Sequence, residues 1–344
     1  MTAKLLLATA NGFVICERDG GDWRVADPAP PDFGEGGKTA RGLAGRPVTS
    51  VIAREGVILA GTPDGVFRSD DLGQNWREAS TGLTTRHVRW LANHPDISDF
   101  EFAGVEPAGI FVSRDGGESW RPSPEVARLR DKHKWFLPYS PEAGCVRGFA
   151  FHGSRAYAAV EVGGALISDD GGETWRLAEG SDGKPDLDGP PEPFIYPDVH
   201  SIGVHPSSPD LVFAPTGGGF YRSTDGGKTW ACLYDCYVRA VWLDPADPDH
   251  LILGPADGVD SHGRIEETRD GGRTWQPAST GLKVPWRRHM VERFTQIGDP
   301  SAGSGQALLA VLSNGELLCA PLATLAWRRI LPDVKDVAAV AGLD

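Results

Sequence analysis

Short apolar runs separated by turn residues fill this chain of 344 residues. The runs are rich in β-branched residues, as at 48–51 (VTSV) and 238–241 (VRAV), and the 3.6-residue period of amphipathic helices is almost absent. With 44 glycines and 27 prolines, the chain supplies the turns that many short strands require. The pattern predicts an all-β fold, with one exception at 125–136 (EVARLRDKHKWF), where we expect a helical turn or more.

Five segments share one eight-residue pattern, which has a hydroxyl residue, an Asp two positions later, a Gly two after that and a Trp three further on. The hydroxyl and Asp side chains can bond nearby backbone N–H groups, the Gly accepts a positive φ, and the Trp can bury its ring beneath a turn. A β-rich segment precedes each copy, so each predicts a tight turn between two strands. The copies are 69–76 (SDDLGQNW), 113–120 (SRDGGESW), 168–175 (SDDGGETW), 223–230 (STDGGKTW) and 268–275 (TRDGGRTW).

The spacing of these turns predicts a β-propeller. Their tryptophans lie 44, 55, 55 and 45 residues apart, a period typical of four-stranded blades. Two degenerate copies, at 18–23 and 320–327, raise the number of blades to seven. The run at 334–337 (VKDV) has no blade after it, so we expect 334–341 to pair into the N-terminal blade and hide both sheet edges. The prediction is one domain, 1–344, a seven-bladed propeller of four-stranded antiparallel blades at 334–341 plus 4–27, 46–80, 87–123, 145–180, 199–233, 237–280 and 290–330.

The long insertions are all predicted to fall on one rim. The loops that enter the innermost strand of each blade lie opposite the Asp-containing turns, and the insertions at 28–46, 122–144, 180–198 and 281–289 all belong to this class. Long loops in a compact repeat protein are more often functional than accidental. We expect them to wall a cup over the central channel.

Composition limits the partners and the compartment. A net charge of −13 argues against non-specific binding of nucleic acid or an anionic membrane, because both need a basic face. The five cysteines show no C-x-x-C spacing, so we expect reduced thiols and not a disulfide framework. No apolar stretch approaches 18 residues and the first ten residues are too short for a signal peptide, so the expected location is the cytoplasm.

Cations recur at the start of the predicted innermost strands. The position after the first Val of each opening run should face the channel, where arginines could bind a carboxylate, sulfate or phosphate. The alternative is that each Arg pairs with an acidic neighbour between blades. Arg89 shares strand parity with Leu91, which favours this alternative at that position. Around the ring the candidate positions are Thr49, Arg89, Arg147, His200, Arg239, Glu292 and Lys335.

Two acids lie in loops expected to reach the same rim. Glu106 and Glu161 follow the second strand of their blades, and an acid among arginines can serve acid/base hydrolysis. Asp257 is a weaker third candidate. Glu161 with Asp198 and His200 is an alternative ligand set for a divalent cation, although no resident cofactor is expected. Ion pairing is the simplest role for either Glu.

An aromatic side chain in one insertion is a further candidate for contact with a ligand. Trp135 follows Lys132, His133 and Lys134, and rings on rim loops commonly stack on sugar faces.

The repeated S-x-D-x-G-x-x-W turn resembles the Asp-box, or BNR repeat, of the sialidase-like β-propellers. For sialidases this resemblance implies an arginine triad, a Tyr nucleophile with a Glu, and an Arg-Ile-Pro motif, which is absent here. Asp-box xyloglucanases use two propellers, whereas related photosystem assembly factors use one as a docking surface. The leading hypothesis is a propeller that binds a small anionic or carbohydrate ligand at the loop-rich face, with glycoside hydrolysis or elimination as its reaction if it is an enzyme. The alternatives are a non-catalytic docking scaffold with a protein partner, and a metal-dependent hydrolase or lyase using Glu161 and His200.

Overall fold

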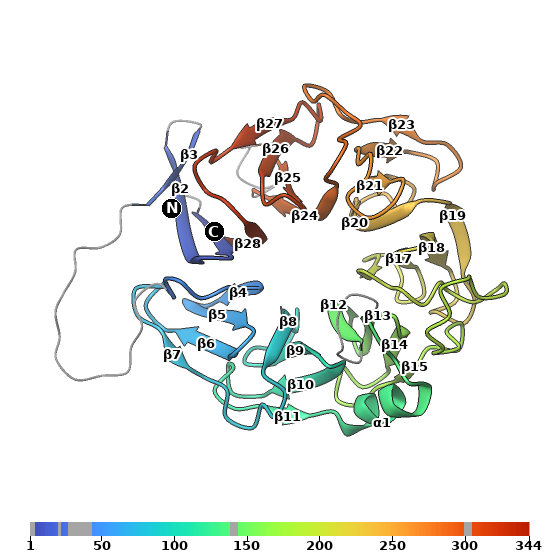
Figure 1. Ribbon diagram of the computed structural model, residues 1–344, viewed down its shortest axis with the longest axis horizontal. Coiled ribbons are helices and arrows are strands. Elements are labelled where there is room, and N and C mark those ends of the chain that lie inside the picture. The colour runs from blue at the N-terminus through green and yellow to red at the C-terminus, as the bar shows by residue number, and fades with distance from the viewer. Residues whose placement is uncertain (1–3, 20–21, 27–42, 138–143, 299–304, 344) are drawn as a thin grey trace.

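Seven four-stranded antiparallel sheets stand around a central channel in the computed structural model (Figure 1). The structure describes residues 4–19, 22–26, 43–137, 144–298 and 305–343. We number the blades 1 to 7 along the chain. Blade 1 is β28 (Val337–Leu343), β1 (Lys4–Thr9), β2 (Gly12–Asp19) and β3 (Asp22–Val25); blade 2 is β4 (Ser50–Arg54), β5 (Val57–Thr62), β6 (Gly65–Ser69) and β7 (Arg77–Glu78); blade 3 is β8 (His87–Asn93), β9 (Glu101–Glu106), β10 (Gly109–Ser113) and β11 (Arg121–Pro122).

The remaining blades follow the same order, from the channel outward. Blade 4 is β12 (Cys145–His152), β13 (Arg155–Glu161), β14 (Gly164–Ser168) and β15 (Arg176–Leu177); blade 5 is β16 (Gly203–Val204), β17 (Val212–Thr216), β18 (Gly219–Ser223) and β19 (Ala231–Tyr234); blade 6 is β20 (Tyr237–Leu243), β21 (Leu251–Ala256), β22 (Glu266–Thr268) and β23 (Gln276–Pro277); blade 7 is β24 (Val291–Ile297), β25 (Ala307–Leu312), β26 (Leu317–Pro321) and β27 (Arg328–Ile330).

The C-terminal strand closes the ring, as the sequence predicts. β28 pairs antiparallel with β1 from Lys4 opposite Leu343 to Thr9 opposite Val337. Both termini therefore lie in the same blade (Figure 1). Closure covers the inner edge of β1 and buries Leu5 and Leu7 between blades.

The Asp-containing turns connect the third and fourth strands, and their polar side chains bond the turn internally. In blade 4, the Ser168 hydroxyl donates to Asp170 Oδ1 at 2.7 Å, and Asp170 accepts from the backbone N–H and hydroxyl of Thr174 at 2.9 and 2.6 Å. Although partial burial opposes the shift, these bonds lower the pKa of Asp170 below its usual range. Gly172 takes a φ of 95°, and its carbonyl accepts from the Trp175 indole.

A second repeated contact joins neighbouring blades. After β7, Thr81 O accepts from the Trp120 N–H of blade 3, and after β23, Thr280 O accepts from the Trp327 N–H of blade 7. The Trp120 and Trp327 indoles donate to backbone carbonyls of the preceding blade. The degenerate turn at 320–327 thus keeps the Trp that anchors one blade to the next.

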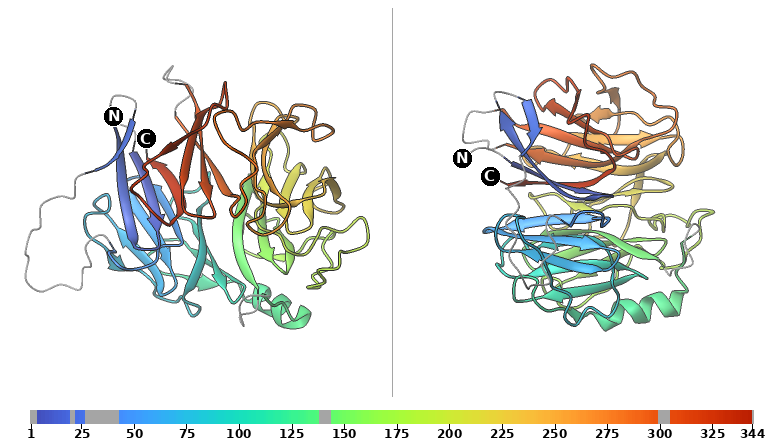
Figure 2. Two further views of the ribbon diagram at one scale, coloured as in Figure 1. Left: turned by 45° about the horizontal axis from the view of Figure 1, so that its top comes forward. Right: turned by 60° about the vertical axis from the view of Figure 1, so that its left-hand side comes forward.

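One segment of the described residues is helical, at the predicted place. α1 (Pro124–His133) packs against β10 and β15 through the buried Val126. The helix lies on the outer edge of the ring and away from the channel, so the helical part of this insertion does not wall the cup (Figures 1 and 2). Residues 28–42 of the predicted cup segment at 28–46, and residues 138–143 of the insertion that contains α1, lie outside the described residues. Across the described ranges, no helix is both long and apolar enough to cross a bilayer.

Candidate functional site

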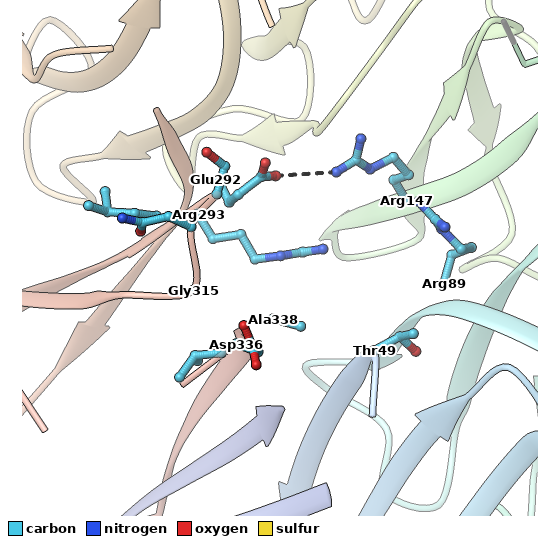
Figure 3. Close-up of a pocket in the computed structure, with 12 residues that line it drawn as sticks. Thr49, Arg89, Arg147, Glu292, Arg293, Gly315, Asp336 and Ala338 are labelled. Atoms are coloured by element: carbon cyan, nitrogen blue, oxygen red, sulfur yellow. Dashed lines mark ion pairs between the residues drawn. The ribbon is translucent and has the colours of Figure 1, made fainter. Parts of the chain in front are cut away.

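A cavity of about 450 Å³ opens where the innermost strands of several blades begin. Its walls come from blades 1, 2, 3, 4 and 7, and the β25–β26 turn forms one side (Figure 3). Its polar side chains include three arginines and two carboxylates. The lining residues are Thr49, Arg89, Arg147, Glu292, Arg293, Leu312, Ser313, Asn314, Gly315, Asp336, Val337 and Ala338.

β-bulges direct the charged side chains into this cavity. Val88 pairs with Val105 and Trp90 with Gly104, so Arg89 is the extra residue of its strand. A bulge reorients the residue that it adds, and Arg89 lines the cavity despite its parity with Leu91.

The same irregularity recurs around the ring. Arg147 is the extra residue between Val146 and Gly148 of β12, and Glu292 is the extra residue between Val291 and Arg293 of β24. A strict two-residue alternation of side chains does not include such an extra residue. The bulge therefore explains why the residue after the first Val of these strands faces the channel.

Most of the predicted cationic side chains form ion pairs with carboxylates. Arg89 Nη1 lies 3.2 Å from Glu106 Oε2, and Arg147 Nη1 lies 3.2 Å from Glu161 Oε2. Arg147 also lies 3.6 Å from Glu292 across the channel. These contacts include pairs within a blade, in addition to the pairs between blades that the sequence suggested.

Glu292 is the acid at the centre of this network. Arg239 of blade 6 donates to Glu292 Oε1 and also contacts the Tyr237 hydroxyl. Burial disfavours the charged form of Glu292, but Arg239, Arg147 and Arg293 together lower the pKa of its carboxyl. Glu292 therefore stays ionised and bridges the cations of blades 4 and 6.

Arg293 differs from the other arginines of the cavity, because no carboxylate of the described residues forms an ion pair with it. Its guanidinium carbon lies 3.7 Å from the centroid of the Trp90 ring, and its side chain reaches toward Arg147 across the open channel (Figure 3). Burial lowers the pKa of Arg293 most, and repulsion from Arg147 and Arg89 lowers it further. Attraction by Glu292 opposes this shift, and the resulting pKa is about 9. The group still carries its charge at neutral pH.

The structure brings four of the seven candidate positions, Thr49, Arg89, Arg147 and Glu292, to one cavity, whereas Arg239 contacts Glu292 without lining the cavity. Glu106 and Glu161 stand behind them as the buried partners of arginines and do not line the cavity. Lys335 lies outside the ring of equivalent positions, because the bulge of β28 falls at Ala338, three residues later.

Trp135 and His200 also lie outside the cavity lining. Trp135 packs in the core between blades 3 and 4, where its indole donates to Gly183 O at 2.8 Å, so its ring faces are covered. His200 is buried at the entry to blade 5, beside Asp198 and Tyr237.

Arg293 is the functional residue that the sequence reasoning missed. It follows Glu292 directly, and on a regular strand its side chain would point to the face opposite that of Glu292. Two adjacent charged residues at the start of an innermost strand, at the place where four other blades carry a bulge, are the signal that could have identified it.

Comparison with known proteins supports the repeat and the fold. The BNR/Asp-box repeat model matches residues 166–177 and 221–231, which include the turns of blades 4 and 5. No curated protein matches the chain by sequence.

Similar solved structures are β-propeller proteins with different functions. An ancestral GH74 enzyme aligns over 86% of this chain and 38% of its own length, at 18% identity and a TM-score of 0.59. A GH74 enzyme of Niastella koreensis aligns over 82% of this chain and 45% of its own length, at 16% identity and a TM-score of 0.56.

A third structure, YCF48 bound to D1 peptide, aligns over 92% of this chain and 96% of its own length, at 14% identity and a TM-score of 0.55. The chain thus spans less than half the length of both GH74 enzymes and nearly all of YCF48. At these identities the likeness concerns the fold alone. The chain is a seven-bladed β-propeller that carries BNR/Asp-box repeats.

Proposed function

We propose that the cavity at the loop-rich end of the channel binds a small organic anion, such as an acidic sugar or another compound with a carboxylate, phosphate or sulfate group. Arg293 would be the principal contact, with Arg147 and Arg89 beside it. The observation that carries the proposal is the charged Arg293 side chain, which extends into the cavity without an ion pair to any described carboxylate.

Electrostatic repulsion within the cavity favours this assignment. Arg147 and Arg89 both disfavour the charged form of Arg293, and the attraction of Glu292 offsets this repulsion only in part. An anion bound among them would remove this repulsion and accept charge-assisted hydrogen bonds. Groups held in unfavourable electrostatic surroundings are characteristic of binding sites.

The size and polarity of the cavity indicate a small ligand. A volume of about 450 Å³ lies within the range of small-molecule sites. Ser313 and Asn314 in the β25–β26 turn add polar groups beside the arginines. The Trp90 ring stacks against the Arg293 guanidinium. A compound with one anionic group and several hydroxyls would match this lining.

Glu106 and Glu161 each have an arginine partner and do not line the cavity. The structural relatives include GH74 enzymes and a propeller bound to a peptide, so fold alone does not choose between catalysis and docking.

The test is a calorimetric titration with a panel of sulfate, phosphate, citrate, glucuronate and uncharged glucose, at low and high ionic strength. Wild-type protein should bind at least one of the anions, with an affinity that falls as salt is added, and should not bind glucose. Arg293→Gln should weaken binding by about tenfold to a hundredfold, since it removes a charge-assisted contact.

Arg155→Gln is the matched control. Arg155 lies outside the cavity lining and pairs with Asp169 and Asp210, and its loss changes the net charge by the same amount. It should bind the anions as wild type does. Equal binding by wild type and Arg293→Gln, or equal weakening by both variants, would reject the cavity as the site.

A further inference from the structure

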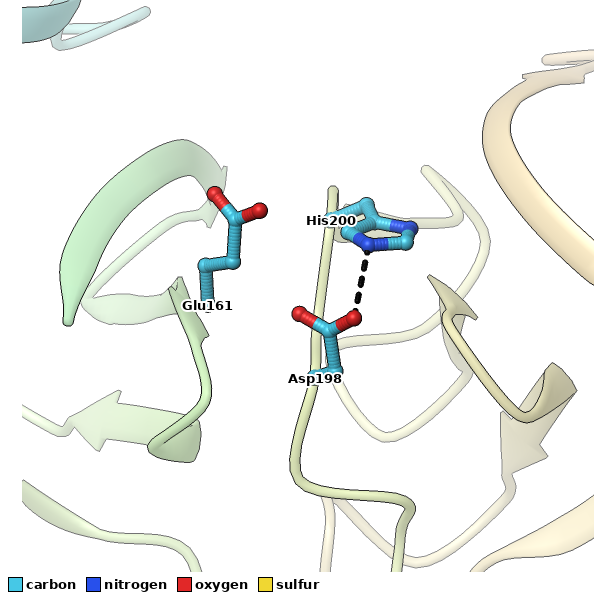
Figure 4. A group of neighbouring side chains, drawn as sticks. All are labelled: Glu161, Asp198 and His200. Carbon is cyan, nitrogen blue, oxygen red and sulfur yellow. Dashed lines mark hydrogen bonds and ion pairs between the residues drawn. The ribbon is translucent and has the colours of Figure 1, made fainter. Parts of the chain in front are cut away.

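We propose a second site next to the anion cavity, where Glu161, Asp198 and His200 bind a divalent transition-metal ion, Mn²⁺ or Zn²⁺. One potential ligand atom from each residue lies within 4.8 Å of the others. Glu161 ends β13 of blade 4, while Asp198 and His200 enter blade 5 (Figure 4). The two sets of side chains face one another across the boundary between these blades.

The hydrogen bonds of His200 prepare one ring nitrogen as a ligand. Nδ1 lies 2.7 Å from the Val238 carbonyl, which can only accept, so Nδ1 carries a proton. In the neutral ring, Nε2 then presents its lone pair to Asp198 Oδ2, which is 3.0 Å away. An imidazole anchored in this way through its other nitrogen is the usual arrangement at metal sites.

Asp198 lacks the donors that a partly buried carboxylate needs. Its Oδ1 is shielded from solvent and accepts no hydrogen bond from the described residues, and neither Arg nor Lys pairs with it there. The Tyr237 hydroxyl oxygen accepts a hydrogen bond from Arg239 and lies 3.3 Å from His200 Nε2. Its proton can therefore be donated to the imidazole, and it makes no hydrogen bond to Asp198 among the described residues. Two ways remain to balance the carboxylate, a protonated His200 or a bound cation.

The surrounding backbone makes room for the Asp198 carboxylate. A Cβ at Gly217 would lie 2.5 Å from Asp198 Oδ2, so a larger residue there would displace the carboxylate. The Gly217 N–H donates to the Asp198 carbonyl and fixes the chain at this point. The carboxylate thus occupies a space that only a glycine leaves open.

Glu161 completes the set from the opposite side. Its side chain is 3% exposed, and Oε2 accepts from the Cys145 thiol at 3.1 Å in addition to its ion pair with Arg147. One imidazole nitrogen and two carboxylates suit Mn²⁺ or Zn²⁺ better than Ca²⁺, which prefers oxygen ligands alone.

The experiment measures metal binding without any anionic ligand. Protein freed of metal with EDTA is returned to a chloride buffer and titrated with Mn²⁺, followed by the EPR signal of the free ion, and separately with Zn²⁺ by calorimetry. We expect one equivalent of at least one ion to bind. Asp198→Asn, which keeps the shape of the side chain, and His200→Gln should each weaken binding by about tenfold or more.

His250→Gln is the matched control, because His250 is also buried between two carboxylates, Asp244 and Glu267, in blade 6. It should bind the ion as wild type does. The proposal would be overturned if wild type failed to bind either ion stoichiometrically, or if Asp198→Asn kept the wild-type affinity. Zinc bound by cysteine thiols would be unaffected by Asp198→Asn, so this result would also contradict the proposal. Arg293→Gln should keep the metal, so failure here and failure of the anion site are separate results.

Discussion

At the scale of single residues, a few partly or fully buried charged side chains lack an ion-pair partner among the described residues. This distinguishes them from the many charged side chains that are paired. Arg89, Arg147 and Arg239 each form an ion pair with a carboxylate, whereas Arg293 stacks on an aromatic ring and has no ion pair with a carboxylate of the described residues. The residue types alone could not show this difference. Pairing depends on which strand lies opposite, and the sequence does not state that directly.

Glu101 offers a residue-scale test of how burial affects charge. It is 4% exposed at the start of β9, and its Oε2 accepts no hydrogen bond from the described residues. Burial, with a contribution from Asp99, raises the pKa of its carboxyl to about 7. Because the folded pKa exceeds the unfolded one, the folded state holds its proton longer, and stability falls as pH rises from about 4.5 to 7.

Glu101→Gln should remove this loss. The variant's free energy of unfolding in urea should match that of wild type near pH 4.5 and exceed it by about 3 kcal/mol at pH 8, since titrations of other groups cancel in the comparison. A difference that does not change with pH would show that folding does not raise the pKa of Glu101.

At the scale of elements, a glycine that follows the fourth strand controls the contact between two blades. Gly82 has a φ of 81°, and a Cβ there would lie 2.0 Å from the Trp120 carbonyl of blade 3. Gly281 stands in the same relation to Trp327 of blade 7. Both close approaches place the Trp beneath the preceding blade.

Gly82→Ala should therefore lower the free energy of unfolding by at least about 2 kcal/mol, since it combines an unfavourable φ with a clash against backbone. Gly153→Ala is the control, because Gly153 has a φ of 57° and no atom near its missing Cβ. It should cost only the conformational penalty, about 1 kcal/mol. Equal losses in urea denaturation would mean that the contact between blades contributes nothing.

At the scale of the whole molecule, the pairing of β28 with β1 joins the last blade to the first. A chain that ends at Asp336 would leave β1 as an open edge and expose Leu5 and Leu7. We expect this truncated protein to aggregate or to lose its single cooperative urea transition, and a peptide of residues 337–344 to restore the transition by adding a strand. A truncated monomer as stable as the full chain would contradict closure by this strand.

Repetition explains why the fold could be predicted and the site only partly. The Asp-box turns recur with the period of a blade, so the number of blades and the closing strand followed from local patterns. Lys335 and Ala338 show where such patterns fail. Two overlapping runs, 334–337 (VKDV) and 337–340 (VAAV), fit the pattern that opens an innermost strand equally well. Only the register of β28 against β1 assigns the channel position to Ala338. The bulges that direct Arg89 and Arg147 inward likewise depend on pairing with a second strand.

The central claim is that an anion binds among Arg293, Arg147 and Arg89, and the most direct test is to see one there. Crystals of the protein soaked in sodium selenate should give an anomalous peak within about 4 Å of the Arg293 guanidinium, and crystals of Arg293→Gln should lose it. A cavity without a selenate peak in the wild-type protein, or a peak that persists in Arg293→Gln, would contradict the account.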